Sequence, residues 1–148
     1  MMKDNVTVRK ATSDDIHTIA TLEAECFSDA STENAIAVLF GMGTVGIVAF
    51  DGNTPCGFAY AADCAGDAEL LRICVKHEYR KCKIGRRLIS ALHNELKSLG
   101  TGSVFLEVRE GNAAAISLYT SEGYVMTGRR KRFYKKPTED ALLLTKEL

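Results

Sequence analysis

The most informative stretch of this chain runs from residue 107 to residue 124: Glu107-Val-Arg-Glu-Gly-Asn-Ala-Ala-Ala-Ile-Ser-Leu-Tyr-Thr-Ser-Glu-Gly-Tyr124. It follows a short apolar strand and places a carboxylate, Glu107, where another apolar residue would be expected. Asn112 is a good helix N-cap, and Gly123 stands where a C-cap glycine would. The stretch therefore predicts a strand followed by a short helix, with Glu107 and Tyr119 as a candidate acid–base pair.

A second stretch, residues 75–87, is strongly basic and links a predicted strand to a long helix. It reads Val75-Lys-His-Glu-Tyr-Arg-Lys-Cys-Lys-Ile-Gly-Arg-Arg87. Unpaired backbone N–H groups and the helix dipole make such a junction suitable for a pyrophosphate. A solvated basic loop in front of a helix is the alternative interpretation.

Hydrophobic periodicity indicates the remaining elements. Strands are predicted at 6–10, 44–50, 56–62, 68–75 and 104–109, with two more between 124 and 145. Helices are predicted at 14–26, around 35–39, at 84–99 and from 113. The order β-α-α-β-β-β-α-β-α-β-β predicts an α/β fold, a mixed and mostly antiparallel sheet flanked by helices, in a single domain over residues 1–148.

Composition excludes several classes of protein. The 148 residues contain no apolar run near the roughly eighteen residues of a membrane helix, and no stretch reads as a signal peptide. The cysteines are odd in number and form no Cys-x-x-Cys pair, so neither a disulfide framework nor a zinc site is expected. A cytoplasmic location without membrane association fits best.

Charge is distributed unevenly along the chain. Residues 11–71 contain no Lys or Arg and ten Asp or Glu, although the whole chain has a net charge of zero. This asymmetry favours a cationic ligand on the acidic side and an anionic ligand on the basic side, unless it is a chance clustering of surface charge.

Two further motifs are better explained by structure than by function. Residues 41–46 match G-x-G-x-x-G, but they follow a helix and open a strand, so a turn is predicted rather than a dinucleotide site. Residues 129–136 hold six cations interleaved with aromatics. An exposed hairpin is expected there, and nucleic-acid binding is the less favoured alternative.

The basic junction, residues 75–87, contains a motif that resembles a known protein family. Arg80-x-x-x-x-Gly85 between a strand and a helix resembles the acetyl-coenzyme A pyrophosphate loop of the GNAT acetyltransferases. The order of elements is similar over nearly the whole chain. Glu107-Val-Arg, followed by Asn112-x-x-Ala-Ile-x-Leu-Tyr119, resembles the branch of ribosomal-protein-alanine N-acetyltransferases.

This resemblance implies the GNAT fold and transfer of an acetyl group from acetyl-CoA to a protein N-terminal amine. It implies Glu107 as general base and Tyr119 as general acid, with no metal. The implied coenzyme contacts are Ile73, Cys74 and Val75 for pantetheine, Arg80, Lys81, Cys82, Lys83, Ile84, Gly85 and Arg86 for pyrophosphate, and Asn112. The implied acceptor contacts are Phe27, Glu69 and Tyr134.

Elementary chemistry is consistent with these roles. An α-amine with a pKa near 7.7–8 is already neutral for roughly a tenth of the time at pH 7, so one carboxylate suffices as base. A tyrosine can donate a proton to the departing thiolate. Glu69, on the strand at 68–75, is the competing candidate for the base.

Two positions depart from the family pattern. Lys83 stands where glycine is usual, which costs about 1 kcal/mol if its φ is positive, although its ammonium could meet a phosphate. The segment 27–31 lacks the Pro-Trp pair typical of the branch. Acetylation of another small amine or a lysine, and an inactive coenzyme-binding or nucleic-acid-binding module, therefore remain open alternatives.

Overall fold

The computed structural model describes residues 5–148, in which seven strands form one sheet in the order β1-β2-β3-β4-β5-β7-β6. The predicted single domain also includes residues 1–4, which lie outside the described residues. All neighbouring strands are antiparallel except β4 and β5, which are parallel. The predicted mixed, mostly antiparallel sheet is thus confirmed.

The order of elements also agrees with the prediction. The strands are β1 (Val6–Lys10), β2 (Val45–Asp51), β3 (Thr54–Cys64), β4 (Asp67–Val75), β5 (Ser103–Arg109), β6 (Val125–Tyr134) and β7 (Glu139–Glu147). The α-helices are α1 (Ile16–Cys26), α2 (Glu33–Gly41), α3 (Ile84–Ser98) and α4 (Ala113–Ser121). Two short 3-10 turns, Ser13–Asp15 and His77–Tyr79, precede α1 and α3.

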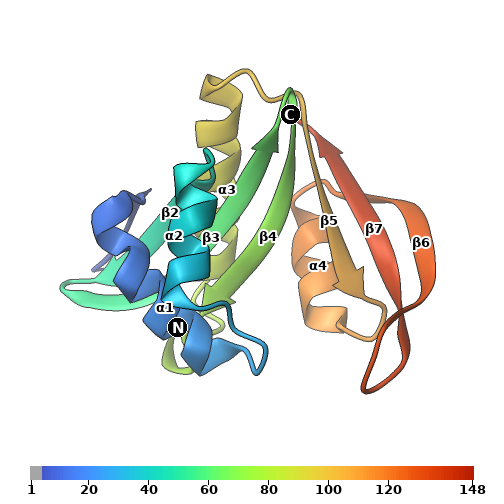
Figure 1. Ribbon diagram of the computed structural model, residues 1–148, viewed down its shortest axis with the longest axis horizontal. Helices are drawn as coiled ribbons and strands as arrows, with labels where there is room; N and C mark the ends of the chain where they lie inside the picture. The colour runs from blue at the N-terminus through green and yellow to red at the C-terminus, as the bar shows by residue number, and fades with distance from the viewer. Residues whose placement is uncertain (1–4) are drawn as a thin grey trace.

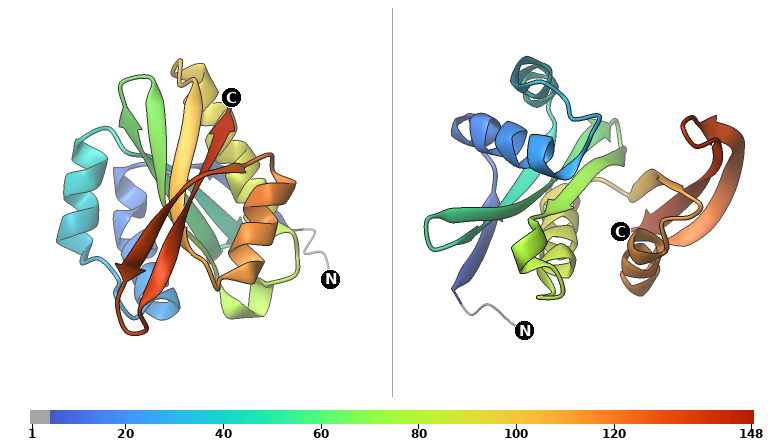
Figure 2. Two further views of the ribbon diagram at one scale, coloured as in Figure 1. Left: turned by 90° about the vertical axis from the view of Figure 1, so that its right-hand side faces the viewer. Right: turned by 90° about the horizontal axis from the view of Figure 1, so that it is seen from below.

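Helices cover both faces of the sheet (Figures 1 and 2). The larger core lies between the sheet and the pair α3 and α4, and the smaller one lies under α1 and α2. The helical repeat of α3 explains its place, because Ile84, Leu88, Leu92 and Leu96 form one fully buried stripe. Each face of the central strands is therefore apolar, which is why the middle of the sheet reads as a nearly continuous hydrophobic sequence.

Local signals fix the helix that follows β5. The Asn112 side chain accepts a hydrogen bond from the backbone N–H of Ala115 at 3.2 Å, which caps α4. Gly123 has a φ of 95°, a left-handed conformation that glycine adopts without steric cost, and it lets the chain turn into β6. The two capping residues confine α4 to a short segment beside the end of β5.

The sheet opens between its two parallel strands. Pairing of β4 with β5 is limited to residues 67–69 with residues 103–105, and beyond that point the strands diverge. Figure 1 shows β4 and β5 meeting near the top of the molecule and separating downwards, and Figure 2 shows the opening from below. The register between β3 and β4 also shifts at Leu71, where β4 carries an extra residue.

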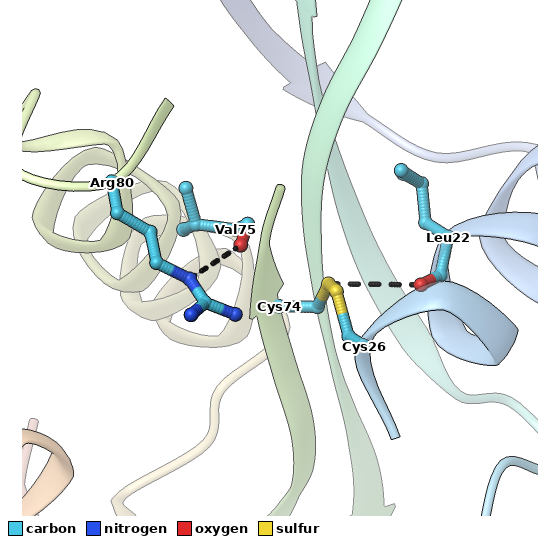
Figure 3. The surroundings of a disulfide bond; sticks show 5 residues. All are labelled: Leu22, Cys26, Cys74, Val75 and Arg80. Atoms are coloured by element: carbon cyan, nitrogen blue, oxygen red, sulfur yellow. Dashed lines mark hydrogen bonds between the residues drawn. A yellow bond between two sulfur atoms is a disulfide. The ribbon is translucent and has the colours of Figure 1, made fainter. Parts of the chain in front are cut away.

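The expectation that the cysteines stay unpaired is wrong for two of them. Cys26, the last residue of α1, forms a disulfide with Cys74 on β4, across 48 residues of sequence (Figure 3). Spacing in the sequence gives no sign of this pair, because the sheet and α1 bring the two residues together only in the fold. Cys56, Cys64 and Cys82 are free thiols.

We therefore expect three thiols to titrate in protein that is denatured without reductant, and five after reduction. Loss of the cross-link should lower the free energy of unfolding by up to about 4 kcal/mol, as expected for a loop of this length. In the native protein Cys64 should react first, because it is exposed and burial raises the pKa of Cys56 to about 11. Five reactive thiols before reduction would contradict the pairing. As a control, Cys64→Ser removes an exposed cysteine outside the disulfide and should leave the free energy of unfolding unchanged.

Neither a membrane-spanning helix nor a metal-binding cluster is found in residues 5–148. None of the helices has the length and apolar character that crossing a membrane requires. No group of three or more His, Cys, Asp or Glu side chains in this part of the chain is arranged to hold a metal ion.

Candidate active site

The opening between β4 and β5 forms a cleft of about 590 Å³. Residues 70–73 of β4 line one wall and residues 106–109 of β5 line the other. Residues 26–29, at the end of α1, and Tyr134, at the end of β6, contribute to the rim. The predicted catalytic pair, Glu107 and Tyr119, lies in this cleft together with Asn112.

Glu107 has an incompletely satisfied carboxylate. Its Oε2 atom is buried and accepts no hydrogen bond from any described residue. The Nε atom of Arg130 lies 3.6 Å away, which is an ion-pair distance but too long for a normal hydrogen bond. Arg109, two residues further along β5, pairs with Glu139 instead. A buried oxygen without a donor is costly unless a bound group supplies one.

Glu69, the competing base, lies where the two strands begin to separate. It is paired with Phe105 across the parallel ladder and is not among the residues that line the cleft. Burial raises the pKa of Glu69 above its ordinary value, and the negative charge of Glu107 raises it further, whereas Arg130 lowers it. The structure thus places both carboxylates close together, with Glu107 the one that faces the cleft.

Tyr119 reaches the cleft from α4. Its side chain is buried, with a relative exposure of 6%, and its ring packs against that of Tyr124 at 5.6 Å between centroids. No residue within 5–148 hydrogen-bonds its hydroxyl. Burial raises the pKa of Tyr119 to about 12, so the phenol remains a proton donor at neutral pH.

The basic junction forms a tight loop at the start of α3. Lys81 and Lys83 have φ values of 64° and 62°, in the left-handed region, so the steric cost anticipated for Lys83 applies. Lys83 occupies the N-cap position without a side-chain hydrogen bond to the first turn. The N–H groups at the start of this 15-residue helix are consequently not capped by that side chain, which suits an anion.

Two arginines of this loop already have partners. The Nε atom of Arg80 donates to the carbonyl oxygen of Val75 at 3.2 Å (Figure 3), which holds the loop against the end of β4. Arg86 forms an ion pair with Glu122 at 2.8 Å. Among the exposed cations of the junction, Lys81 and Lys83 in the loop and Arg87 in the first turn of α3 make no ion pair with a described residue.

We expect Lys83→Gly to raise the free energy of unfolding of the ligand-free protein by about 1 kcal/mol, because glycine adopts a φ of 62° without a Cβ penalty. Urea denaturation measures this change. Lys76→Gly is the matched control, since φ is −56° at that lysine and the substitution should only destabilise. A Lys83→Gly variant no more stable than the parent would show that the left-handed conformation carries no cost here.

Two of the three predicted acceptor contacts, Phe27 and Tyr134, line opposite sides of the cleft. Phe27 lies at the end of α1 beneath the guanidinium of Arg72, with 4.3 Å between the Arg72 Cζ atom and the ring centroid. Tyr134 lies on the other side, under Arg109 at 4.4 Å. The basic hairpin that contains Tyr134 is exposed, as expected, and its Arg129 pairs with Glu110 and Asp140.

The backbone of β4 is open towards the cleft. From Leu70 to Val75 this strand has no partner on its β5 side, so backbone groups there can bind an extended ligand by hydrogen bonds. The side chain of Cys74 points to the opposite face, where it joins the disulfide and the smaller core. A ligand could therefore contact Cys74 through its backbone only.

Sequence reasoning did not identify Arg72 as part of the site. In the structure Arg72 pairs with Asp29 at 3.1 Å. The extra residue at Leu71 changes which side chains of β4 point to each face of the sheet, and no pattern in the sequence predicts such a bulge. The disulfide beside the cleft was missed for a similar reason.

Comparison with known proteins gives a family and several relatives. The sequence model of the "Acetyltransferase (GNAT) family" matches residues 15–124. The ribosomal protein bS18-alanine N-acetyltransferase of Escherichia coli strain K12 is 37% identical over 91 residues. That match covers 59% of this chain, and the chain spans only 60% of the length of the relative. The corresponding protein of Haemophilus influenzae is 34% identical over 88 residues, 60% of each sequence.

Solved structures agree in fold over almost the whole chain. The crystal structure of the ribosomal-protein-S18-alanine N-acetyltransferase from Escherichia coli superposes with a TM-score of 0.88 at 26% identity, and covers 96% of this chain and 93% of that one. A GNAT family acetyltransferase from Elizabethkingia anophelis, solved with acetyl-CoA bound, gives a TM-score of 0.79 at 20% identity over 99% of this chain and all of that chain. At that identity the second likeness concerns the fold alone.

Proposed function

The chain belongs to the GNAT acetyltransferase family, and from that premise we propose that it transfers an acetyl group from acetyl-coenzyme A to the N-terminal α-amine of a protein, with a ribosomal protein as the favoured acceptor. Glu107 is the general base and Tyr119 the general acid. The observation that carries the proposal is the buried Glu107 oxygen that lacks a hydrogen-bond donor, in the same cleft as an unbonded tyrosine hydroxyl.

The residues present suit the coenzyme. The left-handed loop at Lys81 and Lys83, together with the N–H groups at the start of α3, suits the binding of a pyrophosphate. The unpaired side of β4 at 73–75 provides backbone hydrogen bonds for pantetheine, and Asn112 lines the cleft nearby. When bound, acetyl-CoA supplies the acetyl thioester, whose carbon is the point of attack.

Proton movements follow from the placement of the acid–base pair. Glu107 accepts the proton that the acceptor nitrogen gives up as the C–N bond forms. Tyr119 donates its hydroxyl proton to the sulfur as the C–S bond breaks, so the coenzyme leaves as a neutral thiol. Proton transfer from Glu107 to the Tyr119 oxygen through the open cleft then restores both groups. Backbone N–H groups of β4 that lack a strand partner can stabilise the charge that develops on the carbonyl oxygen.

Two observations support a protein N-terminus as the acceptor. Two relatives are named for acetylating the alanine of a ribosomal protein, and this supports the same class of acceptor here. Residues 11–71, which include part of one side of the cleft, carry ten Asp or Glu and no Lys or Arg, and this suits an ammonium group. The acidic residues attract the ammonium form that predominates in solution, and its neutral fraction is the form that attacks the thioester and gives one proton to Glu107.

Release of coenzyme A thiol in the presence of different acceptors tests the proposal. We expect release with peptides whose first residue is alanine, and little with polyamines, aminoglycosides or N-terminally blocked peptides. Preference for a polyamine or aminoglycoside would favour a small-amine enzyme. Calorimetric binding of acetyl-CoA without thiol release from any acceptor would instead favour a coenzyme-binding module.

A further inference from the structure

The segment between α1 and α2, residues 27–32, forms one wall of the cleft but has little regular structure of its own. Among the described residues, backbone–backbone hydrogen bonds reach only its ends, from Phe27 N to Glu23 O and from Ile36 N to Thr32 O. Phe27 and Asp29 both line the cleft. Side-chain contacts must therefore set the shape of this wall.

Contacts with the rest of the fold fix both ends of this segment. The disulfide ties Cys26 to β4 immediately before the segment begins. At the far end, the fully buried carboxylate of Glu23 accepts hydrogen bonds from the backbone N–H of Ser31 and from the Tyr60 hydroxyl. Neither tie reaches residues 27–29, which lie between them.

Arg72 provides the missing contacts. Its Nη1 and Nη2 atoms donate to the side-chain Oδ1 and the backbone carbonyl of Asp29, each at 3.1 Å. The same guanidinium covers the Phe27 ring at 4.3 Å. The Arg72 side chain is 20% exposed, whereas that of Asp29 is 81% exposed, so the arginine is the fixed partner and the segment is the part that it holds.

We propose that Arg72 is the positioning residue of the acceptor site: it holds Phe27 and Asp29 against β4 and thereby sets the affinity for the acceptor peptide. This inference rests on the proposed function. Arg72 acts through the wall and not on the reacting atoms, because the acid–base pair lies on β5 and α4. Its loss should therefore change acceptor binding and leave the chemical step and coenzyme binding in place.

Steady-state kinetics with an N-terminal peptide, at saturating acetyl-CoA, test this role. We expect Arg72→Gln to raise the KM for the peptide about tenfold, as for the loss of one charge-assisted contact. The kcat and the KM for acetyl-CoA should stay close to the parent values. Arg72→Lys should not rescue the peptide KM, because an ammonium cannot make two parallel hydrogen bonds and stack on a ring at once.

Arg9 offers a matched control outside the cleft. It makes a two-pronged ion pair with Asp15 at 2.8 Å and lies over the Phe50 ring at 5.2 Å, so Arg9→Gln removes a similar set of contacts elsewhere. It should destabilise the fold without raising the peptide KM. An equal rise in both variants, or a loss of kcat alone in Arg72→Gln, would overturn the inference.

Amide hydrogen exchange gives a second readout that requires no activity. Residues 27–31 should exchange faster in coenzyme-free Arg72→Gln than in the parent or in Arg9→Gln. Unchanged exchange there would overturn the inference by itself. If the parent enzyme acetylated no peptide, the proposed function would be contradicted. Faster exchange in Arg72→Gln would in that case still support the claim that Arg72 positions residues 27–31.

Discussion

Glu107→Gln should lower kcat by about 10²–10⁴-fold, the range expected when a general base is removed. The substitution keeps the shape of the side chain, and the affected Oε2 atom makes no hydrogen bond that would be lost. Affinity for acetyl-CoA should be unchanged, since Glu107 is not part of the left-handed loop at Lys81 and Lys83, the proposed pyrophosphate site at the start of α3. A thiol-release assay measures kcat, and calorimetric titration with acetyl-CoA measures the affinity for the coenzyme.

Glu69→Gln is the control for this prediction, because it removes the neighbouring carboxylate and leaves the one that faces the cleft. Its effect on kcat should be much smaller. If Glu69→Gln abolished turnover while Glu107→Gln turned over normally, the assignment of the base would have to be reversed.

Tyr119→Phe has the second largest expected effect, a decrease in kcat of about 10²-fold from loss of the general acid. The phenylalanine ring keeps the packing against Tyr124, and no hydrogen bond between described residues is lost, so stability should change little. Thermal unfolding alongside the kinetics separates the two effects. A variant that is fully active would show that the thiolate leaves without this proton donor.

The pH profile gives an independent check on Tyr119. Because burial raises its pKa to about 12, the phenol stays protonated up to about pH 10 and should cause no fall in rate below that point. The rate should rise towards pH 8 as the acceptor α-amine loses its proton. A decrease in kcat between pH 8 and pH 10 that disappears in Tyr119→Phe would contradict a pKa near 12.

Much of the fold is accessible from the sequence because each element carries its own local signal. The stripe of leucines in α3, the Asn112 cap and the turn at Gly123 place the elements to within about two residues. The order of strands and helices then leaves few possible topologies. The basic loop in front of α3 could be predicted for the same reason, since a run of cations and a helix start are both local features; that it binds an anion is part of the proposal.

The cleft itself depends on features that are not local. Separation of β4 from β5 after three paired residues, and the extra residue at Leu71, follow from how the whole sheet packs. These two features decide that Glu107 faces the cleft and that Arg72 meets Asp29. The pairing of Cys26 with Cys74 likewise depends on how α1 lies on the sheet. Residue types alone could nominate Glu107 and Glu69 as bases but could not rank them by geometry.

The central claim is that the cleft acetylates an N-terminal α-amine with the help of Glu107. It is tested most directly with a peptide that begins with alanine and also contains an internal lysine, incubated with acetyl-CoA and analysed by fragmentation mass spectrometry. We predict that the acetyl group is found on the alanine nitrogen, and that Glu107→Gln largely abolishes this product. An acetyl group found on the lysine side chain, or on the alanine in undiminished yield with Glu107→Gln, would contradict the account.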